Sequence, residues 1–301
     1  MSAEIILHHY DTSPFSEKAR LMLGLHGLAW RSVIQPTIMP KPDLTPLTGG
    51  YRRAPVMQIG ADVYCDSQLI MAEIARRAGA PLAGELGWAV NLWADRIFFG
   101  ASVAVIFGEI GANTPQAFID DRERLMGRKF DVQAMKAAQA PMSAQWRVQA
   151  GWIEGELARG GPFLAGAKAG LTDVAAYMNV WFLSSFTPHL ADPLLAGFER
   201  LQGWRARMAA IGHGKRSELT PIEALAIARR AEPESGVGHD PADPLKPGME
   251  VTVSADDYGR DPVAGRLVAA NSEQVAIARE DTDLGRLHVH FPRVGYMVMT
   301  R

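Results

Sequence analysis

A helix that opens with a proline follows a short apolar strand near the amino terminus, and this strand-to-helix turn strongly constrains the fold. The run Ile5–His9 has the composition of a strand, and the run Lys18–His26 has the spacing of an amphipathic helix. Between them, Ser13 fits the N-cap and Pro14 fits the first helical position, where its missing N–H needs no partner. Unpaired N–H groups and the positive end of the helix dipole converge on the Ser13 hydroxyl. The turn is therefore suited to an anion, including a thiolate.

A second proline leads a predicted hairpin. Pro55 enters an apolar strand that ends at Ile59, and after a tight turn a second strand ends at Cys65. Proline cannot donate to a strand ladder, so it must lie at the start of its strand or at a sheet edge. A second helix then begins at Asp66 and Ser67, where the two side chains can cap the exposed amides.

In this order, the elements resemble the amino-terminal thioredoxin-like domain of the glutathione transferase superfamily, and we assign residues 1–80 to such a glutathione-binding domain. In that family the proline at the position of Pro55 is cis, and the backbone of the next residue, here Val56, pairs with the cysteinyl part of glutathione. The resemblance also implies that Asp66 faces the ammonium of the γ-glutamyl part and that Ser67 faces its carboxylate. A helix start with one carboxylate and one hydroxyl is complementary to that pair of charges.

The glycine carboxylate of glutathione needs a cation, for which Lys41, Arg52 and Arg53 are the candidates. Adjacent residues of an extended chain point to opposite faces, so at most one of the two arginines is expected to reach the site. We carry Arg53 and Lys41 forward as the predicted binding residues.

The chemistry expected at such a site is activation of the glutathione sulfur by Ser13. Lowering the thiol pKa by about two units corresponds to roughly 2.7 kcal/mol. A hydrogen bond to a charged acceptor is worth about 1.5–3 kcal/mol, and a helix N-terminus adds about 0.3–1 kcal/mol. The Ser13 hydroxyl and the helix dipole together are therefore sufficient, with Ser13 as a donor and not as a nucleophile.

Two other hydroxyls compete for this role. Tyr10 ends the first strand, where some transferase classes carry a tyrosine, and Ser16 falls one turn into the helix. We favour Ser13 because a serine directly before Pro-Phe matches the catalytic position of the serine- and cysteine-type classes. Cysteine-type members reduce thiols through mixed disulfides, so the serine here disfavours that chemistry.

The composition of the chain limits the cellular setting and the classes of binding partner that we expect. A net charge of −2 over 301 residues gives no general attraction to nucleic acid or to an anionic membrane. The apolar stretches Ile97–Gly108 and Val174–Pro188 are shorter than the roughly 20 residues that span a bilayer. A single cysteine, Cys65, fits a reduced, cytoplasmic setting and the role of a small buried hydrophobe, and the amino terminus has no signal-peptide pattern.

From residue 85 to about 230 the helical period dominates, which predicts an all-helical transferase carboxy-terminal domain. Leu171–Tyr177 resembles the start of the family's central helix, with Asp173 retained from its capping box and Gly170 at the cap position. In this family the electrophile lies between the two domains, and the abundant aromatics of this region favour an apolar one. The family is usually dimeric, so we expect a homodimer.

The remaining sequence predicts a linker and a small β domain. Residues 231–247 are rich in proline, glycine and acidic residues, which is typical of a linker or an ordered strap. Residues 248–301 alternate with a period of two and predict a small antiparallel, SH3-like barrel, which we expect to support a dimer, bind a partner or cover a pocket. His288 and His290 share a strand face, but without an accompanying cysteine or well-spaced carboxylate we expect no metal site.

These features together predict a soluble glutathione transferase that uses glutathione as co-substrate in detoxification of an apolar electrophile. Two alternatives remain open: a non-catalytic protein that uses the transferase fold to bind glutathione or a partner, and a protein that does not bind glutathione.

Overall fold

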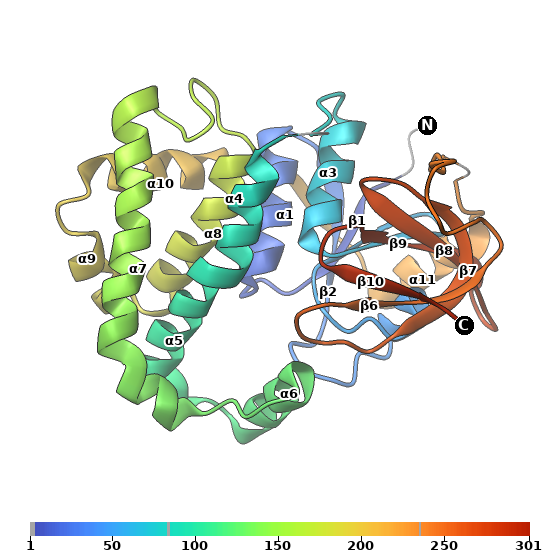
Figure 1. Cartoon of the computed structure of the whole chain (residues 1–301), viewed down its shortest axis with the longest axis horizontal. Coiled ribbons are helices and arrows are strands. Elements are labelled where there is room, and N and C mark those ends of the chain that lie inside the picture. The colour runs from blue at the N-terminus through green and yellow to red at the C-terminus, as the bar shows by residue number, and fades with distance from the viewer. Residues whose placement is uncertain (1–3, 83–84, 235) are drawn as a thin grey trace.

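The computed structural model describes residues 4–82, 85–234 and 236–301, in which the strands form one ten-stranded sheet beside a helical region (Figure 1). The strands are β1 (Ile6–His9), β2 (Ala29–Ile34), β3 (Val56–Ile59), β4 (Asp62–Cys65), β5 (Lys215–Glu218), β6 (Glu250–Ala255), β7 (Val263–Ala270), β8 (Gln274–Asp281), β9 (Gly285–Pro292) and β10 (Tyr296–Thr300). Their spatial order is β10-β6-β7-β8-β9-β4-β3-β1-β2-β5.

Most helices of the described residues lie between residues 85 and 230, where the helical period dominates the sequence. They are α1 (Pro14–Leu25), α2 (Thr45–Thr48), α3 (Ser67–Arg77), α4 (Gly87–Trp93), the π-helix η1 (Ala94–Phe98), α5 (Phe99–Ile110), the 3₁₀ turn η2 (Gly111–Asn113), α6 (Gln116–Met126), α7 (Val132–Gly160), α8 (Leu171–Phe186), α9 (Pro188–Leu195), α10 (Glu199–Ile211) and α11 (Pro221–Arg230).

The amino-terminal part has the predicted thioredoxin-like order of strand, helix, hairpin and helix. β1 pairs in parallel with β2 and antiparallel with β3, and β4 closes the hairpin against β3. Neighbouring residues of β1 face opposite sides of the sheet. Leu7 packs into the core formed with α1 and α3, whereas Ile6 packs with Leu219 and Ala224 from the segment that contains α11. The Ala54–Pro55 peptide bond is cis, as predicted.

The helical region is built on one continuous helix, α4-η1-α5, that packs against α7 and α8. The helix formed by residues 87–113 is long and apolar enough to cross a membrane, judged by length and composition alone. It is longer than the apolar stretch Ile97–Gly108 identified in the sequence, because the structure extends the helix beyond that stretch. Its packing against two other helices is that of a core helix. The start of α8 keeps part of the expected capping box: Asp173, which is fully buried, accepts the N–H groups of Gly170 and Leu164.

The helical region ends before the predicted boundary at about 230. After α10 the chain returns to the first domain, where β5 pairs in parallel with β2 and α11 packs on the sheet. The Gln58 side chain donates a hydrogen bond to the carbonyl of Ala224 in α11. β5 was not predicted from the sequence, because Lys215–Glu218 is a fully exposed polar edge strand without an alternating apolar pattern.

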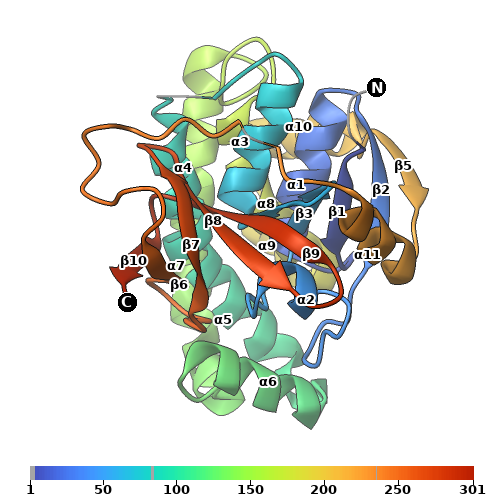
Figure 2. The ribbon, with the colours of Figure 1, turned by 90° about the vertical axis from the view of Figure 1, so that its right-hand side faces the viewer.

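The carboxy-terminal tail, residues 248–301, is strand-rich and antiparallel, as predicted, and it is continuous with the first domain (Figure 2). β9 pairs in parallel with β4, and the buried Val63 and Cys65 share one core with Ile277 and Phe291 of the tail. Because β9 pairs with β4, the tail also covers a sheet edge that would otherwise expose unpaired backbone groups. On either side of residue 235, the segment before the tail is bonded to the sheet: the Glu234 N–H donates to the Asp62 carboxylate, and the Asp240 N–H donates to the Ala270 carbonyl.

Candidate active site

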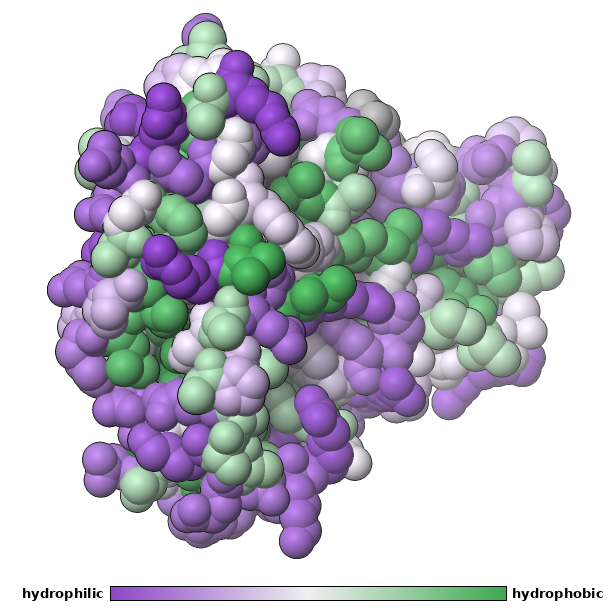
Figure 3. Space-filling view, turned by 60° about the vertical axis from the view of Figure 1, so that its left-hand side comes forward, coloured by the Kyte–Doolittle hydropathy of each residue, from purple (hydrophilic) through white to green (hydrophobic). Residues whose placement is uncertain are grey.

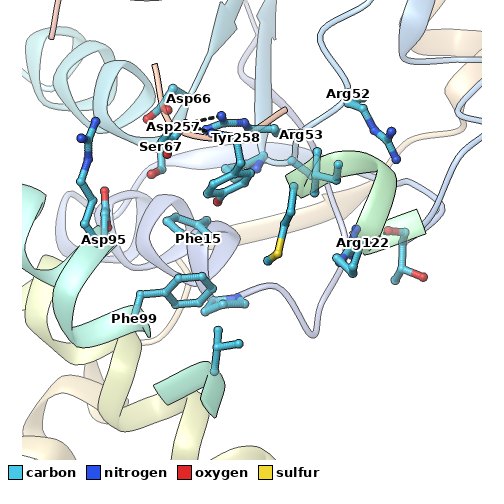
Figure 4. Close-up of a pocket in the computed structure, with 18 of the residues that line it drawn as sticks. Phe15, Arg52, Arg53, Asp66, Ser67, Asp95, Phe99, Arg122, Asp257 and Tyr258 are labelled. Atoms are coloured by element: carbon cyan, nitrogen blue, oxygen red, sulfur yellow. Dashed lines mark hydrogen bonds and ion pairs between the residues drawn. The ribbon is translucent and has the colours of Figure 1, made fainter. Parts of the chain in front are cut away.

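A pocket lies where the start of α1, the loop before β3, the start of α3, the helices α5, α6 and α8, and two turns of the tail come together (Figure 4). One side is apolar. The Phe15 ring contacts the Phe99 ring edge-on, with the ring centroids 4.8 Å apart, and the Phe99 ring stacks on the Phe182 ring, with the centroids 6.0 Å apart. The other side carries charged groups from both domains. A pocket with this division suits a molecule with a charged part and an apolar part.

Ser13 caps α1 as predicted, and Pro14 takes the first helical position. The Ser13 Oγ accepts the Ser16 N–H at 3.1 Å, which leaves its own O–H available as a donor. Ser13 is 1% exposed and its neighbours Thr12 and Pro14 face the pocket. The Ser13 hydroxyl is therefore buried next to the pocket, and Ser13 itself is not among the described residues that line it.

The alternative hydroxyls are placed differently. Tyr10 lines the pocket, with the Lys41 Nζ 5.8 Å from the centre of its ring. Ser16 is fully buried, and its Oγ has no hydrogen-bond partner in the described part of the chain. Thr12 was not singled out from the sequence, yet it is the hydroxyl nearest to Ser13 in the chain that faces the pocket.

The residues expected to hold the γ-glutamyl part lie together at the start of α3. Asp66 has a φ of +74° and caps the helix, because its Oδ1 accepts the Gln68 N–H at 2.9 Å. Its Oδ2 accepts the Tyr296 hydroxyl of the tail at 3.0 Å. Asp66 and Ser67 both line the pocket. A carboxylate offers about four lone-pair positions, so Asp66 can still accept an ammonium group.

Pro55 lines the pocket together with Ala54, whereas Val56 is fully buried within β3. The Val56 side chain belongs to the core shared with the tail. Any contribution of Val56 to the pocket is therefore limited to its backbone.

The three candidate cations line the pocket, and each has a partner. The Lys41 Nζ donates to the Arg52 carbonyl at 2.9 Å, and burial lowers the pKa of Lys41 to about 8. Arg52 pairs with Asp121 of α6. Arg53 pairs with Asp257 of the tail. The expectation that at most one arginine would reach the site is wrong: the two side chains diverge toward α6 and the tail, and both line the pocket because it is bounded by both elements.

The tail supplies pocket residues that were not predicted from the sequence, among them Asp257, Tyr258 and Tyr296. Tyr258 stacks on Arg53, with the guanidinium carbon 4.1 Å from the ring centre. In the described structure its hydroxyl makes no hydrogen bond, and burial raises its pKa, so it is a neutral donor. The nearby Gly259 has a φ of +57° and its N–H donates to the Leu125 carbonyl, which fixes this turn against α6. The aspartates and the glycine around Tyr258 predict a turn in the sequence. They do not predict that this turn packs against α6 and the pocket.

A buried ion pair joins α1 to η1 at the pocket. The Lys18 Nζ, which is fully buried, donates to both carboxylate oxygens of Asp95 at 2.7 and 2.8 Å. Burial raises the pKa of Asp95, and Lys18 opposes that effect. Asp95 also accepts the Asn91 side-chain amide. The pair fixes the helical region relative to the helix that carries Ser13.

A second buried network anchors the Ser13 turn. Arg20 donates to the Glu17 carboxylate at 2.7 Å, to the Asp11 carbonyl at 3.0 Å and to the His9 Nδ1 at 3.1 Å. Burial, helped by Arg20, lowers the pKa of His9 to about 3, so its ring is neutral. The turn that contains Ser13 is thus stabilised, on the side away from the pocket, by the hydrogen bonds and ion pair of Arg20.

A thioredoxin-like domain with a cis proline beside its ligand pocket, followed by a helical region, defines the glutathione transferase fold. Residues 7–82 match the family described as glutathione S-transferase, N-terminal domain. A crystal structure of a GST-like protein from Pseudomonas syringae is 36% identical, covers 99% of this chain and 100% of its own, and superposes with a TM-score of 0.82. The chain therefore belongs to the glutathione transferase superfamily.

More distant structures share the fold but match only part of this chain. The theta class glutathione S-transferase of Xanthomonas axonopodis pv. citri, solved with glutathione bound, is 21% identical with a TM-score of 0.52, and the match covers 71% of this chain and 98% of that chain. FzlA from C. crescentus is 23% identical with a TM-score of 0.53, covering 74% of this chain and 92% of its own. No curated protein sequence matches. The match over 99% of the chain shows that the Pseudomonas syringae protein shares the tail.

Proposed function

We propose that this protein is a glutathione transferase that activates the glutathione thiol for attack on an apolar electrophile. One observation carries the proposal: Asp66 and Ser67 at the start of α3 and the phenylalanines on α1, α5 and α8 line one pocket. The γ-glutamyl part of glutathione would lie against Asp66 and Ser67, and the electrophile would lie against Phe99 and Phe182. The thiol would then fall between them, near the start of α1.

Ser13 is the proposed thiol-activating group. Its hydroxyl lies at the positive end of α1 and keeps a free proton, because its oxygen accepts the Ser16 N–H. Donation of that proton to the sulfur stabilises the thiolate, and the dipole adds to the effect. Tyr258 offers a second neutral hydroxyl from the tail, at the polar side of the same pocket.

For the glycine carboxylate we propose Arg53 and Lys41, both of which line the pocket. Arg53 has five N–H donors, and its pair with Asp257 and its stacking on Tyr258 leave several of them free. The tail would thereby orient the arginine that binds glutathione.

The proposal extends to a homodimer in the cytoplasm with a role in detoxification. Apolar side chains support a dimer: Ile97 is 63% exposed and Trp152 is 58% exposed on the helical region. Figure 3 shows apolar residues gathered near the middle of the helical side of the molecule. Light scattering of the purified chain at two concentrations tests this extension, and a monomer at both would remove it.

Calorimetry paired with an activity assay tests the main proposal. Glutathione should bind the full chain at one site and should be conjugated to a standard aromatic electrophile. Binding without conjugation, isomerisation or peroxidase activity would favour the non-catalytic alternative. No binding would contradict both.

A further inference from the structure

A cluster of polar side chains lies where the tail joins the thioredoxin-like sheet. In the parallel pair of β4 and β9, Asp62 is opposite His288, and Tyr64 is opposite His290. Side chains two residues apart on a strand share a face, so Asp62 projects on the same side as both histidines. The carboxylate that the sequence pattern lacked is therefore supplied by a strand from the other end of the chain.

The ligating atoms of these side chains converge. The Asp62 Oδ1 lies 2.8 Å from the His290 Nε2 and 3.9 Å from the His288 Nδ1. All three atoms lie within 4.8 Å of one another. Asp62 and His290 are each 1% exposed and His288 is 14% exposed, so the cluster reaches solvent on the His288 side.

Other groups orient the buried members of this cluster. The Asp62 Oδ2 accepts the Glu234 N–H at 2.6 Å, and the His290 ring stacks on Tyr64 with centroids 4.5 Å apart. The His290 Nδ1 lies 3.2 Å from the Gln274 Oε1. Histidines that bind metals commonly donate their other ring N–H to an oxygen in this way. The outer partners leave the Asp62 Oδ1 and the His290 Nε2 facing each other.

We propose that Asp62, His288 and His290 bind a divalent transition metal ion of the zinc class. Two imidazoles and one carboxylate form the protein ligand set of zinc sites that keep one position open, with bonds of about 2.0–2.2 Å. Water can take the open position from the His288 side. The ion bridges β4 and β9 and stabilises the docking of the tail.

Metal titration tests this site without any assay of turnover. The full chain is treated with a chelator, dialysed and titrated with ZnCl₂ by calorimetry, and Co²⁺ is added to a second sample for absorption spectroscopy. We expect one Zn²⁺ per chain, a higher melting temperature with Zn²⁺ and a cobalt ligand-field band. His288→Gln should weaken Zn²⁺ binding by roughly tenfold or more.

The matched control is His189→Gln, because His189 is 60% exposed beside Glu109 on the helical region and tests adventitious binding. That variant should bind Zn²⁺ as the wild type does. Wild-type protein without stoichiometric binding, or equal affinity in His288→Gln, would overturn the proposal. If His288→Gln has a lower melting temperature without metal, Asp62→Asn provides a second variant, in which retained binding would also overturn it. Failure of the metal site leaves the proposed transferase activity untouched.

Discussion

The Arg53 guanidinium carbon lies 4.1 Å from the centre of the Tyr258 ring, and the same guanidinium pairs with Asp257 at 2.5 Å. Arg53 precedes the cis proline of the thioredoxin-like domain, whereas Asp257 and Tyr258 belong to the turn between β6 and β7 of the tail. A segment from near the carboxyl terminus thus forms one wall of the pocket. The tail is part of the candidate active site and not an appended module.

This contact predicts coupling between the two parts of the chain. Arg53→Met and Asp257→Asn should show a coupling free energy of about 1–3 kcal/mol in a double-mutant cycle, because Arg53 is only 12% exposed. Urea unfolding of the four proteins measures it. Arg286→Met with Glu280→Gln is the matched control, since that pair is exposed and should give a clearly smaller coupling free energy. Equal coupling in the two cycles would contradict a structural role for Arg53.

Ser13→Ala should lower turnover of glutathione with an aromatic electrophile by about tenfold or more. The variant loses a hydrogen bond to a charged sulfur, worth about 1.5–3 kcal/mol, while the γ-glutamyl contacts remain. Glutathione affinity by calorimetry should therefore change little. Ser272→Ala, an exposed position in a turn of the tail, is the control for the same chemical change. Unchanged turnover in Ser13→Ala would transfer the role to Tyr10, Thr12 or Tyr258.

Tyr258→Phe separates the hydroxyl from the ring. The variant keeps the stacking on Arg53, so the fold and the glutathione affinity should be retained. If the hydroxyl donates to the thiolate or to the electrophile, kcat should fall several-fold and the thiol pKa read from the pH–rate profile should rise. Tyr177→Phe removes a hydroxyl from a tyrosine packed on Trp204 in the helical region and should leave the profile unchanged. A profile for Tyr258→Phe equal to wild type would limit this residue to packing.

Buried neutral histidines predict how stability depends on pH. Burial lowers the pKa of His8 to about 4, and burial with Arg20 lowers that of His9 to about 3, from 6.5 in the unfolded chain. The unfolded state therefore binds more protons between pH 6.5 and about 4. The free energy of unfolding should fall as pH decreases through this range, by up to about 1.4 kcal/mol per pH unit for each histidine.

Urea unfolding between pH 7.5 and 4.5 checks this slope. His8→Gln should reduce it, because glutamine does not titrate and can still bond to Gln58. His189→Gln, at an exposed position, should leave the slope unchanged. A slope that is the same in wild type and His8→Gln would show that His8 does not control the pH dependence.

The sequence predicted the elements whose signals are local. Ser13 with Pro14 caps α1, the proline-led hairpin has its cis bond, and Asp66 opens α3, because capping and proline geometry depend on a few neighbouring residues. Asp173 likewise caps α8. These features also located the part of the candidate site that we propose for glutathione.

The contacts between distant segments could not be predicted from one sequence. The pairing of β4 with β9 joins segments more than two hundred residues apart, and it decides that Tyr258 and Tyr296 reach the pocket. The ion pair of Lys18 and Asp95 could not be predicted either, because a lysine in a helix normally points to solvent. β5 is polar and exposed, so no hydrophobic period marks it. Each depends on tertiary pairing and leaves no local pattern.

The most direct test of the central claim is a crystal structure of the full chain with glutathione bound. The account predicts the γ-glutamyl group at Asp66 and Ser67, the sulfur within hydrogen-bonding distance of the Ser13 hydroxyl, and the tail turn of Asp257 and Tyr258 in contact with the ligand. Glutathione bound elsewhere, or a sulfur that faces away from the start of α1, would contradict it.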